Sequence, residues 1–151
     1  MAYTTYSELV TYFEAMPTVV TDLKSAIVGD DEEILNMQNS RVRYPVLWVE
    51  TPEVVFAGLG DADRVKRFRF SLAVVENDAI KSNEKANAKL SDTLAVLEQV
   101  YARIIADADD PGNFTLVYKD EALDPIRRWS GDNGYGWRGS IEIEIERDEC
   151  L

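Results

Sequence analysis

The strictest pattern in this chain is an alternation of isoleucine and glutamate close to the C-terminal end. The alternating residues are Ile141, Ile143 and Ile145 on one face and Glu142, Glu144 and Glu146 on the other. Side chains of a β-strand point to opposite faces with a period of two, so this stretch predicts a half-buried strand. The isoleucines supply an apolar face for a core, and the glutamates form an acidic stripe that must meet water, cations or a basic neighbour.

A second stretch, residues 64–76, alternates in the same way and carries Arg67 and Arg69 on its polar face. Its apolar face consists of Phe68, Phe70, Leu72 and Val74. If this strand lies beside the last strand with matched faces, ion pairs form between the arginines and the glutamates. If it does not, the arginines are available to an adjacent subunit. The two arginines and the three glutamates are therefore a candidate subunit interface.

Four shorter stretches predict further strands. Residues 44–49 are apolar on both faces, which is typical of a strand buried on both sides, with Pro45 at its start or on a free edge. The other three are residues 53–57, 114–118 and 125–129, the last of which is either a strand or an extended arm. The turn residues 131–134 predict a hairpin that leads into the final strand.

The N-terminal region predicts short helices. Thr5 and Glu8 have the spacing of a capping box, and Pro17 ends or kinks the helix that follows. Residues 18–27 predict a second short helix, with a strand as the alternative because several of them are β-branched. The acidic run Asp30, Asp31, Glu32 and Glu33 favours the first turn of a third helix. This run is either a solvated cap or a candidate acidic surface for a lumen or a partner.

The strongest helix is predicted over residues 83–107. Its apolar residues recur at steps of three and four and form one stripe. That stripe consists of Leu90, Leu94, Leu97, Tyr101 and Ile104. Long stripes of this kind usually cover a sheet. The chain is thus expected to be one α+β domain, residues 1–151, in which the long helix covers one face of an antiparallel or mixed sheet of about four to five strands.

Composition argues against several classes of function. The formal net charge is -12, which disfavours a protein that holds nucleic acid through its phosphates. The chain has no histidine, and Cys150 is its one cysteine, so the commonest general base and the commonest metal ligands are missing. No motif for a nucleotide, calcium ion or catalytic nucleophile is present. We therefore expect no enzyme activity, no cofactor and no metal, and neither a signal peptide nor a membrane span.

The order of elements resembles that of the tail-completion or tail-terminator-like proteins of tailed bacteriophages and phage-derived particles. That order is short helices, antiparallel strands, a long helix and closing strands. Two short segments carry the specific part of the resemblance. They are the Tyr-Pro strand start at residues 44–50 and the Gly-Trp strand opening at residues 132–138. Neither segment is a diagnostic motif, and the arrangement covers nearly the whole chain.

The resemblance implies a structural protein of a virion or phage-like particle that is assembled in the bacterial cytoplasm. Members of this group form rings, commonly hexamers, that end the tail tube or join the tail to the head or neck. It implies tube, sheath or neck proteins as partners, and DNA only as a passing occupant of the lumen. The alternative is a small acidic intracellular interaction module, dimeric and without catalysis.

Overall fold

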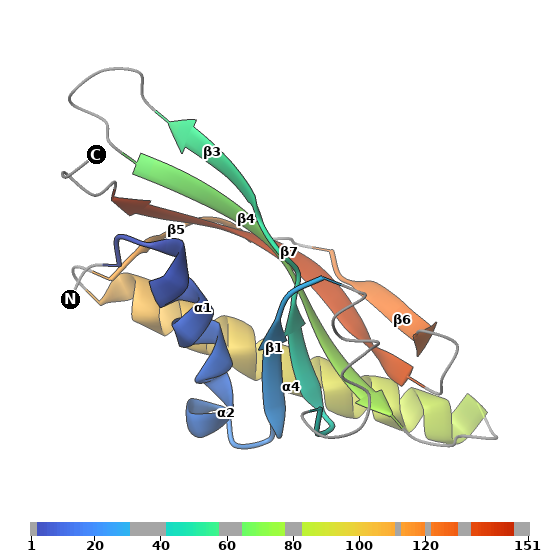
Figure 1. Cartoon of the computed structure of the whole chain (residues 1–151). Helices are drawn as coiled ribbons and strands as arrows, with labels where there is room; N and C mark the ends of the chain where they lie inside the picture. The colour runs from blue at the N-terminus through green and yellow to red at the C-terminus, as the bar shows by residue number, and fades with distance from the viewer. Residues whose placement is uncertain are drawn as a thin grey trace.

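The computed structural model describes residues 3–30, 42–57, 65–77, 83–110, 113–119, 122–129 and 134–146. These residues form an α+β fold, in which one long helix and two short N-terminal helices pack on a mixed sheet of seven strands (Figure 1). The fold class predicted from the sequence is confirmed. The sheet is larger than the four to five strands expected.

Two long strands form the centre of the sheet. β4 (Val65–Asn77) and β7 (Gly134–Glu146) have 13 residues each and pair antiparallel along their whole length. β2 (Val46–Val49) and β3 (Glu53–Ala57) pair one after the other with the free side of β4. β5 (Thr115–Lys119) and β6 (Asp124–Trp129) do the same on β7. Each long strand therefore pairs with two short ones, and β1 (Ser25–Val28), which pairs with β2, is the seventh strand.

The expected helix over residues 18–27 is wrong. α2 (Met16–Val19) is a single turn with Pro17 in its first turn, and β1 (Ser25–Val28) follows as a strand parallel to β2. Leu23 is buried, whereas Val19 is 47% exposed. Residues 25–28 form a strand in spite of the helical spacing, because the edge of β2 offers a ladder of backbone hydrogen bonds. Tertiary context here overrides weak local propensity.

The sheet has two unlike ends. At the covered end, formed by β1, β2 and β6 with residues 72–77 of β4 and 134–139 of β7, both faces carry buried side chains. A second apolar cluster lies there on the face away from the helices, and its buried members are Val46, Trp48, Ala73 and Val75. At the half-open end, formed by β3 and β5 with residues 65–70 of β4 and 141–146 of β7, only the helix side carries buried side chains.

The main core lies between the sheet and the helices. Phe68, Phe70, Leu72 and Val74 of β4 and Ile141, Ile143 and Ile145 of β7 are all buried in it. From the N-terminal side, α1 (Tyr6–Glu14) contributes Leu9 and Phe13. The Phe13 ring lies 4.9 Å from that of Phe70, and the Tyr6 ring stacks on Phe68 at 5.8 Å. The helix side of the half-open end is therefore covered by α1 as well as by the long helix.

The long helix, α4 (Asn83–Asp109), covers the sheet with a stripe that differs slightly from the predicted one. Leu90, Leu97, Tyr101 and Ile104 are buried, but Leu94 is only half-buried and Thr93 is 1% exposed in its place. The Thr93 hydroxyl donates to the carbonyl oxygens of Lys89 at 2.9 Å and Leu90 at 3.1 Å. Because that bonding satisfies the hydroxyl, threonine is tolerated in the core and the stripe shifts by one residue. No helix in the described part of the chain is long and apolar enough to cross a membrane.

Candidate functional site

The half-open end presents a charged face on the side of the sheet away from the helices. The register of β4 and β7 places Arg67 opposite Glu144 and Arg69 opposite Glu142. Arg67 Nε donates to Glu144 Oε2 at 2.8 Å, and Arg69 Nε donates to Glu142 Oε2 at 3.3 Å. The hydrogen bond and the negative charge of Glu144 raise the pKa of Arg67 above its ordinary value. The two alternating strands are therefore neighbours with matched faces.

Two further ion pairs extend the charged face. Arg69 Nη1 lies 3.8 Å from Glu53 Oε2 on β3. Closer to the covered end, Arg138 Nη2 lies 3.4 Å from Glu50 Oε1, and the Arg138 guanidinium lies 5.5 Å from the centre of the Trp48 ring. The charged face thus consists of three arginines that share four glutamates. Its members are Arg67, Arg69, Arg138, Glu50, Glu53, Glu142 and Glu144.

The charged face is shallow and exposed to solvent. Arg69 and Glu53 keep 59% and 67% of their side-chain surface exposed, whereas Glu142 keeps 14%. A depression of about 520 Å³ lies over the meeting point of β3, β4 and β7 and is lined by Glu53, Arg69, Phe70, Ser71, Ser140, Ile141 and Glu142. Exposed ion pairs contribute little to stability, so this face is better suited to contact with solvent or a partner than to holding the fold together.

The other predicted acidic positions are less well defined. Glu146 is exposed at the end of β7, opposite Val65. Asp30 is exposed, and its charge, after burial, is a second cause of the raised pKa of Tyr6. Asp31, Glu32 and Glu33 lie outside the described residues. The roles of these acids in a lumen or at a subunit contact stay predictions.

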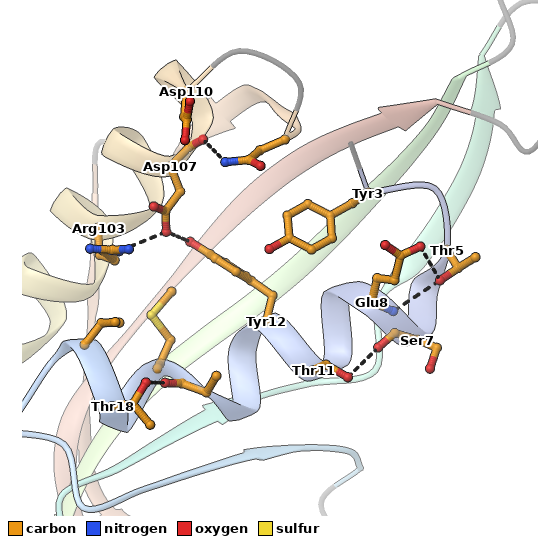
Figure 2. Close-up of a pocket in the computed structure, with 14 residues that line it drawn as sticks. Tyr3, Thr5, Ser7, Glu8, Thr11, Tyr12, Thr18, Arg103, Asp107 and Asp110 are labelled. Carbon is orange, nitrogen blue, oxygen red and sulfur yellow. Dashed lines mark hydrogen bonds and ion pairs between the residues drawn. The ribbon is translucent and has the colours of Figure 1, made fainter. Parts of the chain in front are cut away.

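A second cavity lies elsewhere, between α1, α2 and the C-terminal end of α4 (Figure 2). It has a volume of about 570 Å³. Tyr12 projects from α1 across this groove toward Asp107 of α4, as Figure 2 shows. The Tyr12 hydroxyl donates to Asp107 Oδ2 at 2.7 Å, and Arg103 Nε donates to the same oxygen at 3.0 Å. Burial and the hydrogen bond to Asp107 raise the pKa of Tyr12 well above its ordinary value.

These bonds join α1 to α4 across the groove. Asp107 Oδ2 accepts from two donors, and the raised pKa of Tyr12 keeps its hydroxyl protonated at neutral pH. Tyr3 also borders the groove, and its ring lies 5.8 Å from that of Tyr12. The ion pair between Arg103 and Asp107 can be predicted from the sequence, because the two residues have i, i+4 spacing on a helix. The contact with Tyr12 joins residues 95 apart, which periodicity does not indicate.

Across the described residues, no group of three acidic or cysteine side chains gathers closely enough to hold a metal ion. Comparison of the chain with protein-family models finds no match, and comparison with curated proteins finds none either.

Proposed function

We propose that this chain is a non-enzymatic structural subunit of a phage or phage-like tail. In this proposal copies of the chain form a ring, expected to be a hexamer, that ends the tail tube or joins the tail to the head or neck. The resemblance in the order of elements suggests this class. The observation that carries the proposal is the pairing of every arginine of the charged face with a glutamate of the same chain.

This pairing suits a surface past which DNA moves without being held. A phosphate that approached Arg67 or Arg69 would have to displace Glu144 or Glu142, and each arginine would gain little by the exchange. The net charge of -12 adds long-range repulsion. Because affinity for DNA depends on cations that are free to replace counterions, a face of this kind binds DNA weakly. In the proposed ring the charged face lines the lumen.

The first test is the mass of the protein in solution, measured by light scattering or native mass spectrometry. A discrete ring supports the proposal. A dimer favours the interaction module instead, and a monomer at every concentration tested contradicts both assemblies.

The second test removes the carboxylate partners of Arg67 and Arg69 without changing the fold. Glu142→Gln combined with Glu144→Gln removes both carboxylate partners, and we expect the double variant to retain DNA on a low-salt column or in a gel shift. Glu84→Gln with Glu98→Gln is the matched control, because these glutamates are exposed on α4 and the change in net charge is equal. If the wild type holds DNA as strongly as the double variant, the lumen assignment is wrong.

A further inference from the structure

The half-open end is a four-stranded layer with two outer strands. Its order is β3, β4, β7, β5, and one row across it joins Val55, Arg67, Glu144 and Thr115. All three pairings are antiparallel, so β3 and β5 run in opposite directions. Among the described residues, no strand pairs with the outer side of either one. Figure 1 shows β3 lying along β4 at the end of the sheet that projects beyond the helices.

β3 has the features of an edge that accepts another strand. It pairs with β4 through five consecutive residues without a bulge. Three of these residues are large and apolar yet exposed: Val54 by 44%, Val55 by 41% and Phe56 by 62%. Neither proline nor lysine interrupts it. Natural proteins usually blunt such edges with a bulge, a charge, a proline or a cover, because a flat apolar edge pairs with other chains.

The other edges carry such protection. The pairing of β5 with β7 shifts at a bulge between Leu116 and Tyr118, and β5 ends in Lys119. β6 contains Pro125 and a second bulge. β1 has four residues and is contacted by α1 and α2. The described part of β3 is therefore the least protected edge of the sheet.

We infer that β3 pairs with β5 of a second copy of this chain, head to tail. Because β3 and β5 run in opposite directions, a second copy placed beside the first without inversion brings its β5 antiparallel to β3. Antiparallel pairing is the more stable ladder. In this arrangement the helix sides of the two copies lie next to each other, and so do their charged faces. The pairing brings exposed Val117 of β5 to the edge that carries Val54 and Val55.

Closure separates this pairing from the pairing of β3 with itself. Two β3 strands that pair with each other close the assembly at two copies and leave both β5 edges open. Unlike edges that pair head to tail repeat around a ring, so this inference rests on the proposed function.

Disulfide trapping tests the inference directly, because Cys150 is the sole cysteine and Cys150→Ser gives a cysteine-free background. In that background, Val55→Cys and Thr115→Cys are made as separate proteins and mixed under mild oxidation. Both positions are exposed, and opposed residues of antiparallel strands lie at distances that a disulfide spans. We expect a covalent heterodimer. Val19→Cys, an equally exposed valine on α2, replaces Val55→Cys in the control and should give none.

A second variant tests the same edge without oxidation. Val55→Lys places a charge on the edge while leaving the helix side of the sheet untouched. We expect loss of the assembled species in native mass spectrometry, with an unchanged circular dichroism spectrum. Val19→Lys is the matched control and should assemble as the wild type does.

The outcomes separate this inference from the proposed function. If Val55→Cys alone forms a homodimer as fast as the mixture forms its heterodimer, β3 pairs with itself and the inference is wrong. If the wild type has the mass of a ring but the mixture gives no heterodimer and Val55→Lys still assembles, the ring stands and the β3–β5 contact is wrong. If the heterodimer forms but the wild type makes open filaments, the strand pairing stands and the ring is wrong. A wild type that stays monomeric overturns both.

Discussion

The same two strands build both ends of the sheet, yet the ends differ in what their far faces carry. At the covered end, β4 presents Ala73 and Val75 on the side away from the helices, and both are buried in the Trp48 cluster. At the half-open end, the same side of β4 carries Arg67 and Arg69, which are paired with glutamates and exposed to solvent. Along one strand the pattern changes from continuous apolar residues to strict alternation.

The two ends of the β4–β7 strand pair therefore contribute different properties to the protein. The covered end contributes stability, because burial on both faces removes more apolar surface from water. The half-open end keeps one face and the β3 edge exposed, and in the proposed assembly that edge binds a second copy. The stability of one end allows the other end to keep an exposed edge.

The largest effect is expected on the helix side of the sheet, which is buried at both ends. Ile143 is 0% exposed and lies opposite Phe68 in the register. Ile143→Asp places an unpaired carboxylate in the core, and we expect a loss of at least about 4 kcal/mol in the free energy of unfolding, enough to leave little folded protein. Chemical denaturation measures it. Val19→Asp, at an exposed position on α2, is the control; a folded Ile143→Asp protein of equal stability would show that the faces are reversed.

The second prediction tests the covered end. Val75 is 0% exposed and lies opposite Gly136. It is on the side of the sheet away from the helices, which carries the charged face at the half-open end. Val75→Glu should lower the free energy of unfolding by about 3 kcal/mol, because the new carboxylate is buried among the apolar side chains of the Trp48 cluster. The control, Arg67→Gln, changes the same face of the same strand at the half-open end and should shift the melting temperature far less. Equal effects at both positions would remove the distinction between the ends.

A third prediction concerns Gly139, which lies on β7 between the two ends. A β-carbon at this position would collide with the Tyr101 hydroxyl and approach Leu123 Cδ2 to 2.6 Å. Gly139→Ala should therefore reduce the free energy of unfolding by about 1–3 kcal/mol through overpacking. Adding Tyr101→Phe removes the hydroxyl oxygen and should restore part of the loss in a double-mutant cycle. Additive effects of the two substitutions would contradict this contact.

The smallest effect is expected at the helix that covers the half-open end. Glu8 N donates to Thr5 Oγ1 at 3.2 Å, and the Thr5 hydroxyl donates to Glu8 Oε1 at 3.0 Å. Thr5→Ala should lower the free energy of unfolding by about 1 kcal/mol, whereas Thr18→Ala, at an exposed hydroxyl outside this cap, should have less effect.

The cap should also depend on pH. The hydrogen bond from Thr5 holds the pKa of Glu8 below its ordinary value of 4.5, so the folded state favours the carboxylate. A depressed pKa stabilises the fold fully above the unfolded value and loses that contribution as the pH falls through the folded value. Melting temperatures between neutral pH and pH 3 should fall less steeply for Thr5→Ala than for the wild type. Parallel curves would mean that the cap does not titrate.

Much of this fold follows from periodicity in the sequence. Strict alternation placed Ile143 inward and Glu144 outward, and the run of apolar residues around Trp48 indicated burial on both faces. The stripe of α4 was predicted apart from Leu94, because helical spacing does not reveal that the Thr93 hydroxyl can be satisfied inside its own helix. The segment at residues 18–27 was misread, because its neighbour β2 is supplied by residues some 20 positions later.

The sequence by itself determined which residues are apolar, which alternate, and where the long helix and the two long strands lie. Those properties depend on neighbours within a few residues along the chain. Only the tertiary structure decided that Arg67 meets Glu144, that Tyr12 meets Asp107, and that β3 is left at an open edge. These contacts join residues far apart in sequence, and they depend on strand order and register, which local spacing leaves open.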